Sequence, residues 1–175
     1  MIITLDNLKI GIHWWQKGNW PMDIHNSDYY EIYDARVGGI TEGWWDATVD
    51  RLSQWRAFRG PKPPNTKAEI RTRGRKIVEQ LTREYESLLG ESTSEPSIMD
   101  ASWENIDGLF GLAAGIQNSP VFAGKMCHFM FPKLFIIMDN QATSVFDYEF
   151  YWRGMQAEWN RFDKKEAAER YLIEA

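Results

Sequence analysis

Two oppositely charged residues, Lys125 and Asp139, stand at the ends of an almost entirely apolar stretch of the chain. The residues between them read MCHFMFPKLFIIM. A charge next to a core costs free energy unless a partner compensates it or a reaction uses it. A lysine amine can act as a nucleophile, and a carboxylate can stabilise a developing positive charge. This pair is therefore the first candidate for chemistry.

The sequence also contains aromatic residues that could contact a ligand. Nine of the 175 residues are tryptophans, which is a high count for this length. Their rings can stack on a planar ligand, although a tryptophan is as readily explained as a core residue. The candidates for a base pocket are Trp14, Trp15, Trp20, Trp44 and Trp45, with His13 beside them and His128 one turn after Lys125.

The chain is acidic overall, with a net charge of −5, but its charge is unevenly distributed. Between Arg51 and Arg83 there are ten basic and two acidic residues, a net charge of +8, so the rest carries −13. This asymmetry indicates an anionic partner, unless the charges only form a solvated helix surface. Arg71, Arg73, Arg75 and Lys76 are the candidates for contacts with a DNA backbone.

Length and composition limit the classes of protein to which the chain could belong. A chain of 175 residues with 43% hydrophobic residues predicts one domain, residues 1–175, with a substantial core. No apolar run is long enough to cross a membrane, and the N-terminus does not resemble a secretory signal. Cys127 is the only cysteine, which excludes a disulfide framework and favours the cytoplasm. No spacing indicates a metal site, we expect no cofactor, and nothing indicates an oligomeric state.

The elements that must position these residues are helices. Capping residues and apolar spacing predict helices after Thr41, from Thr66 to Leu89, from Asp100 or Ser102 to the break at Asn118, and from Ser119 to about Phe131. Residues 135–138 fit a short strand or an extended buried segment. Asp139 can cap a helix with Phe146 and Phe150 inward, and Asp163 can begin a last helix. Residues 1–40 show little periodicity, so we expect an irregular aromatic-rich region packed on a mostly α-helical body.

The sequence from Gly124-Lys125 through Pro132 to Asp139 resembles the catalytic half of the helix–hairpin–helix DNA glycosylases. The 8-oxoguanine-glycosylase-like branch is the most similar, and the resemblance covers about residues 105–150. It implies a helical fold of that family and DNA as the partner. It also implies Lys125 as a Schiff-base nucleophile, Asp139 as the catalytic carboxylate and Gly124 beside a DNA phosphate. The family hairpin usually has two glycines before the lysine, and residues 118–124 contain one.

The resemblance implies an enzyme that excises a damaged or modified base, with strand cleavage if Lys125 forms a Schiff base. Defence against phages that carry modified bases is one role such an enzyme could have. Two other interpretations remain open: a non-catalytic helical nucleic-acid-binding module and a helical protein-interaction domain. For the two central residues, the plainer interpretations are that Asp139 only caps a helix and that Lys125 is a surface lysine.

Overall fold

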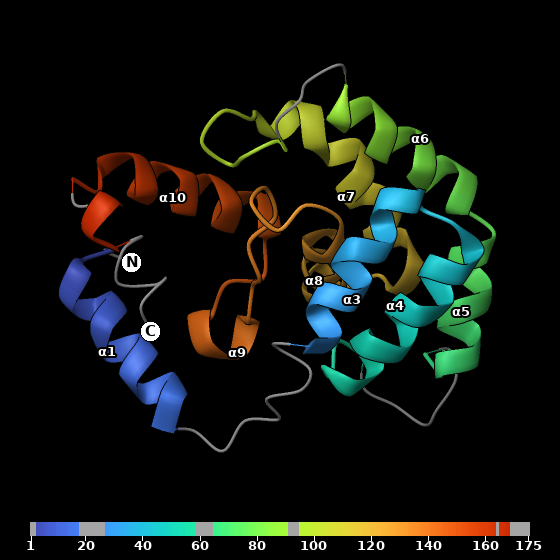
Figure 1. The fold of residues 1–175 in the computed structure, drawn as a ribbon, viewed down its shortest axis with the longest axis horizontal. Coiled ribbons are helices and arrows are strands. Elements are labelled where there is room, and N and C mark those ends of the chain that lie inside the picture. The colour runs from blue at the N-terminus through green and yellow to red at the C-terminus, as the bar shows by residue number, and fades with distance from the viewer. Residues whose placement is uncertain (1–2, 18–26, 59–64, 91–94, 164, 169–175) are drawn as a thin grey trace.

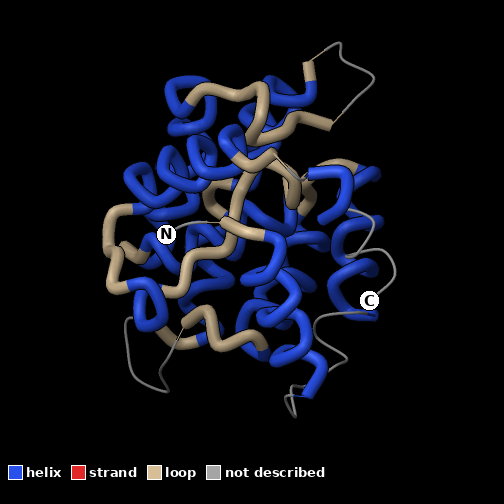
Figure 2. The backbone as a smooth tube through the Cα atoms, turned by 90° about the vertical axis from the view of Figure 1, so that its left-hand side faces the viewer, coloured by secondary structure: helices blue, strands red, loops and turns tan. Residues whose placement is uncertain are grey.

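The computed structural model describes residues 3–17, 27–58, 65–90, 95–163 and 165–168. Within these residues the regular structure is helical and there is no strand (Figures 1 and 2), so the prediction of a mostly α fold is confirmed. The elements are α1 (Leu5–Lys17), α3 (Ser27–Ala35), the 3-10 helix η1 (Arg36–Gly38), α4 (Glu42–Gln54), α5 (Lys67–Arg75), α6 (Val78–Leu89), α7 (Trp103–Gln117), α8 (Pro120–Met130), α9 (Asn140–Thr143) and α10 (Tyr148–Arg161).

The N-terminal region corrects one expectation. Residues 1–40 were expected to be irregular, but they contain α1 and α3. Leu5, Leu8 and Ile12 recur with the spacing of one helix face, and all three are partly buried. Thr4 caps this helix, because its hydroxyl accepts a hydrogen bond from the Asn7 N–H at 3.1 Å. The aromatic residues that follow obscured this pattern.

Capping residues begin α4 and α5 as the sequence predicts. The Thr41 hydroxyl accepts a hydrogen bond from the backbone N–H of Trp44, and Thr66 forms a reciprocal capping box with Glu69. The predicted continuous helix to Leu89 is wrong, because the chain turns between α5 and α6. Gly74, near this turn, packs directly on the Trp45 ring: a Cβ there would lie 2.0 Å from the indole.

Helices α7 and α8 form a tight hairpin at the centre of the molecule (Figure 1). Asn118 adopts a left-handed conformation with φ of 56°, and Ser119 caps α8 by accepting from the Phe122 N–H. Helix α8 contacts α3, α4, α7 and α10. Most of its side chains are therefore buried, including those of Phe122, Met126 and Phe129.

A buried arginine, Arg36 of η1, forms an ion pair with the segment before α7 and a hydrogen bond with the end of α8. The Arg36 guanidinium is 2.8 Å from the Glu95 carboxylate and donates to the Met130 carbonyl at 2.8 Å and to the Tyr85 hydroxyl at 3.2 Å. It also lies 3.8 Å from the centroid of the Tyr33 ring. Only 7% of Arg36 is exposed, so these partners compensate a charge that would otherwise be costly.

The C-terminal part begins with an irregular segment. Residues 135–138 form no strand, so that alternative is wrong; Phe135 and Met138 are buried, and Ile136 and Ile137 are partly buried. The short helix α9 follows, and Asp147 caps the separate helix α10. Phe146 and Phe150 were expected to point inward, but each is 70% exposed. No helix in the described part of the chain is long and apolar enough to cross a membrane.

Candidate functional site

The segment that leads to Asp139 is held by an unusual set of hydrogen bonds. We call residues 134–138 the strap. Four consecutive carbonyls of the strap each accept a hydrogen bond from an aromatic side chain of another element. The donors and acceptors are Trp152 Nε1 to Leu134 at 2.8 Å, His128 Nδ1 to Phe135 at 2.7 Å, Tyr148 Oη to Ile136 at 2.6 Å and Tyr151 Oη to Ile137 at 3.2 Å. These bonds satisfy the carbonyls of a backbone segment that belongs to no helix or strand.

Three of these donors lie on one face of α10. Tyr148, Tyr151 and Trp152 have the spacing i, i+3 and i+4, which places them side by side on the helix. Burial raises the pKa of both tyrosine hydroxyls, so each remains a protonated donor. This spacing is visible in the sequence, but it could not be recognised as functional because nothing local shows which carbonyls the rings meet.

Asp139 follows the strap directly and is exposed. Its own carbonyl accepts from the N–H and the hydroxyl of Thr143, at 3.0 and 2.8 Å, so it stands at the beginning of α9. Leu134, Phe135 and Met138 are completely buried in front of it. A carboxylate at the surface is thus attached to a backbone that the core holds in place.

Lys125 is half-buried in the middle of α8. Its Nζ donates to the carbonyl of Trp55, at the end of α4, at 3.1 Å and lies 5.0 Å from the centroid of the Trp55 ring. A lysine at this position complements the partial negative charge of a helix C-terminus. The interpretation of Lys125 as an ordinary surface lysine therefore does not fit, and Trp55 is a contact that the sequence did not reveal.

His128 and Cys127 have packing roles in this region. Burial lowers the pKa of His128, so the neutral ring with its proton on Nδ1 is the form that donates to Phe135. Its ring lies 6.3 Å from that of Trp55, and so it joins the strap to the surroundings of Lys125. Cys127 is fully buried and its pKa is raised by burial, which makes it an inert apolar residue.

The tryptophan candidates do not gather in one place. Trp44 and Trp45 are core residues, and their indole N–H groups donate to the carbonyls of Ile32 and Arg71. Trp14 is 65% exposed on α1, where His13 is also exposed. Helices α1 and α4 lie toward opposite ends of the molecule (Figure 1). The side chain of Trp15 and all of Trp20 lie outside the described residues.

The predicted basic stripe is largely paired within the protein. Arg71 and Arg75 form ion pairs with Asp46, and Arg71 and Lys67 with Asp50, so α4 supplies acids that face the bases of α5. A hydrogen bond from Lys67 lowers the pKa of Asp50. Arg73 donates to Asn65, and Lys76 is exposed. The stripe therefore presents less positive charge than its residues suggest.

Gly124 does not stand where the resemblance places it. It lies inside α8, beyond the first turn, where a helix no longer has unpaired N–H groups. Its hydrogen faces the ring of Tyr148, and a Cβ there would lie 2.7 Å from that ring. This position does not favour the expected contact with a DNA phosphate; the close packing of α8 against α10 accounts for the glycine instead.

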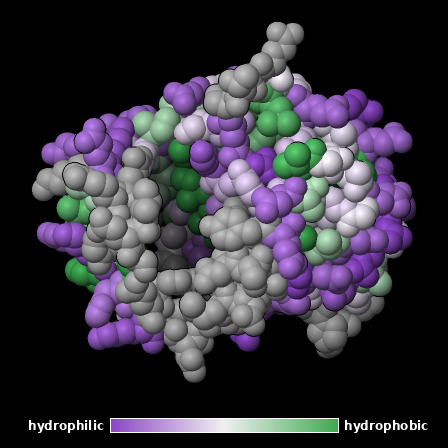
Figure 3. Space-filling model, viewed as in Figure 1, coloured by the Kyte–Doolittle hydropathy of each residue, from purple (hydrophilic) through white to green (hydrophobic). Residues whose placement is uncertain are grey.

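The face in Figure 3 is hollowed in the region where α9 and the beginning of α10 lie, and hydrophobic side chains line its upper wall. The basic helix α5 lies at the far end of the long axis from this hollow (Figure 1). Asp139 directly precedes α9, so the candidate carboxylate and the basic stripe lie in different parts of the molecule (Figure 1).

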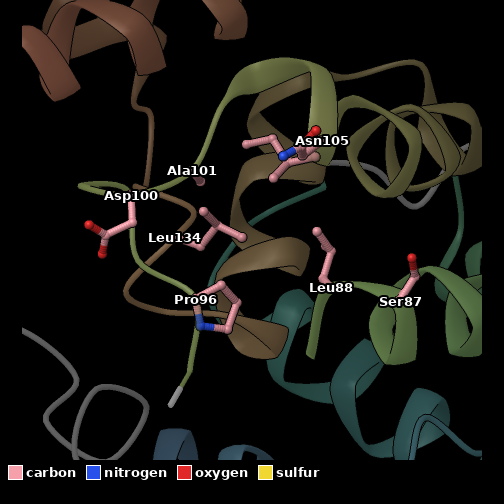
Figure 4. Close-up of a pocket in the computed structure, with 8 residues that line it drawn as sticks. Ser87, Leu88, Pro96, Asp100, Ala101, Asn105 and Leu134 are labelled. Carbon is pink, nitrogen blue, oxygen red and sulfur yellow. The ribbon is translucent and has the colours of Figure 1, made fainter. Parts of the chain in front are cut away.

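A separate cavity of about 390 Å³ lies behind the strap, between α6 and α7. Leu88, Pro96 and Leu134 form its apolar part (Figure 4). Its polar residues do not converge, because Asp100 points away from Asn105 and Ser87 (Figure 4). This arrangement favours no particular ligand.

The described residues contain no group of three or more histidine, cysteine, aspartate and glutamate side chains that could hold a metal ion. Comparisons of the chain with known protein families, with curated proteins and with solved structures found no match.

Proposed function

We propose that this protein is a DNA glycosylase that removes a damaged or modified base from DNA, with Asp139 as its catalytic carboxylate. The observation that carries the proposal is the position of Asp139. It is an exposed carboxylate directly after a backbone segment that is held by hydrogen bonds from four aromatic side chains. Catalytic groups require this kind of fixed placement.

The chemistry that a carboxylate supplies here is electrostatic. When the N-glycosidic bond breaks, its electron pair leaves with the base and positive charge develops on the sugar. A carboxylate close to that sugar stabilises the charge, and water then adds to C1′ and loses a proton. The base must first leave the stack and enter a pocket, for which the apolar wall of the hollow is suited.

Lys125 is the candidate for a covalent version of the same reaction. A neutral lysine amine can keep its hydrogen bond to Trp55 through one N–H and still offer a lone pair. Attack of the amine on C1′ would expel the base with its bonding electron pair; loss of a proton from the nitrogen, breakage of the C1′–O4′ bond and protonation of O4′ would then give a Schiff base, which can support strand cleavage. Its half-buried position beside an aromatic ring supports this role.

The test is base release from oligonucleotides that carry a panel of damaged and modified bases. Alkali then cleaves the strand at each abasic site, and we expect cleavage with at least one base of the panel. Double- and single-stranded forms are compared, because the hollow sets no preference. If no base of the panel is released from either form of the DNA, the proposal is contradicted.

Borohydride reduction separates the two mechanisms. If Lys125 is the nucleophile, the wild-type protein forms a trapped adduct with DNA and Lys125→Gln does not. The exposed Lys133→Gln is the matched control and should be trapped like the wild type. Base release by Lys125→Gln without any adduct would assign the attack to water and leave Asp139 as the one proposed catalytic group.

A second candidate function, protein interaction, is favoured by the surface of α1. Ile10 and Trp14 are one turn apart and are 67% and 65% exposed, which is typical of an anchoring pair in an interface. This function predicts no salt-dependent binding to DNA at 50 and 200 mM salt. It also predicts self-association, measured by sedimentation, that Trp14→Ala abolishes and Val37→Ala, at another exposed apolar position, leaves unchanged.

A further inference from the structure

The backbone of the strap is held by more contacts than its buried side chains alone provide. Leu134, Phe135 and Met138 are completely buried, and these three side chains already attach the segment to the core. Ile136 and Ile137 are only partly buried, yet their carbonyls are bound by Tyr148 and Tyr151. These two hydrogen bonds act on the residues immediately before Met138 and Asp139, where they set the direction in which the chain leaves the core.

The two hydroxyls are well placed for this task because their rings cannot move far. Tyr148 is stacked on Phe110 with centroids 4.3 Å apart and fills the space above Gly124. Tyr151 follows one turn later on α10, with its ring centroid 6.2 Å from that of Tyr148. A rigid donor fixes the position of its acceptor more closely than a long flexible side chain would.

We propose that Tyr148 and Tyr151 are positioning residues, whose hydroxyls hold the backbone at Ile136 and Ile137 and thereby orient the carboxylate of Asp139. This inference rests on the proposed function for its catalytic consequence. Loss of both hydroxyls would let the end of the strap shift while the rings still pack. A displacement of about 1 Å is enough to reduce a rate by up to two orders of magnitude.

The experiment compares the double variant Tyr148→Phe/Tyr151→Phe with the wild type and with Tyr85→Phe. The control also removes one buried hydroxyl, which accepts from Arg36 and lies outside the strap. Three quantities are measured: the single-turnover rate of base release, the dissociation constant for the same DNA, and hydrogen exchange of the peptide that covers residues 134–140.

For the double variant we expect a rate at least about tenfold lower, an unchanged dissociation constant and at least about tenfold faster exchange in residues 134–140. Tyr85→Phe should match the wild type in all three. A wild-type rate in the double variant would overturn the inference, and so would a rate that falls only in parallel with DNA affinity, as expected from general loosening.

Failure of the proposed function can be recognised separately. If the wild type releases no base, the glycosylase proposal fails, and hydrogen exchange alone decides whether the hydroxyls hold the strap. Exchange in residues 134–140 that is no faster in the double variant than in Tyr85→Phe would overturn the positioning role.

Discussion

At the scale of single residues, His128, which donates to the strap, should make the stability of the protein depend on pH. Burial holds its pKa below the ordinary value near 6.5, so the unfolded chain binds a proton at a higher pH than the folded chain does. Stability is therefore complete above pH 6.5 and is lost as the pH falls toward the lowered pKa. The slope can reach about 1.4 kcal/mol per pH unit for this one group.

The variant His128→Asn tests this linkage, because the asparagine amide can replace Nδ1 as a donor and does not titrate. We expect denaturant unfolding between pH 7 and 5 to show a smaller loss of stability in this variant than in the wild type. His13→Asn, at an exposed position, is the control and should keep the wild-type slope. Equal slopes in all three proteins would show that His128 does not cause the effect.

At the scale of elements, the glycines of the α7–α8 hairpin divide into two kinds. Gly111 and Gly115 face open space on α7, whereas Gly124 touches Tyr148. We expect Gly111→Ala and Gly115→Ala each to raise the unfolding free energy by about 0.5–1 kcal/mol, because alanine favours the helix. Gly124→Ala should lower it by about 1–3 kcal/mol through overpacking. Equal effects on thermal unfolding would contradict this account of the hairpin.

The ion pair between η1 and the segment before α7 should be essential to the fold. Glu95→Gln keeps the shape of the side chain but removes the one opposite charge that pairs with the buried guanidinium of Arg36 in the described residues. We expect the unfolding free energy to fall by about 3 kcal/mol. The matched control is Glu104→Gln, which removes an exposed partner of Arg153 and should leave stability almost unchanged. A mild effect of Glu95→Gln in urea unfolding would show that the pair is dispensable.

How much the sequence predicts also differs between elements. The helix α5 and the hairpin turn at Ser119 follow from local capping residues, and the structure has both. The exposure of Phe146 and the role of Gly124 were missed, because each depends on how α8 and α10 meet. Lys125 and Asp139 were selected by their charge and by the family resemblance, whereas Trp55 and the strap donors depend on contacts between residues distant in the chain.

At the scale of the whole molecule, the pairing between α4 and α5 decides how the protein presents its charge. Three bases of α5, Lys67, Arg71 and Arg75, are compensated by Asp46 and Asp50. If this face approaches DNA, Asp46→Asn/Asp50→Asn should tighten binding and steepen its dependence on salt concentration, because positive charge is released. Titration of a labelled duplex at several salt concentrations measures both. Unchanged binding would place the DNA on another face.

The most direct test of the account compares Asp139→Asn with Asp147→Asn. Both replace an exposed carboxylate directly before a helix, where asparagine is also a favoured residue. The measurement is the single-turnover rate of base release on a substrate that the wild type cleaves. We predict a rate at least about 100-fold lower for Asp139→Asn, with DNA affinity unchanged, and a wild-type rate for Asp147→Asn. A wild-type rate for Asp139→Asn would contradict the assignment of Asp139 as the catalytic carboxylate.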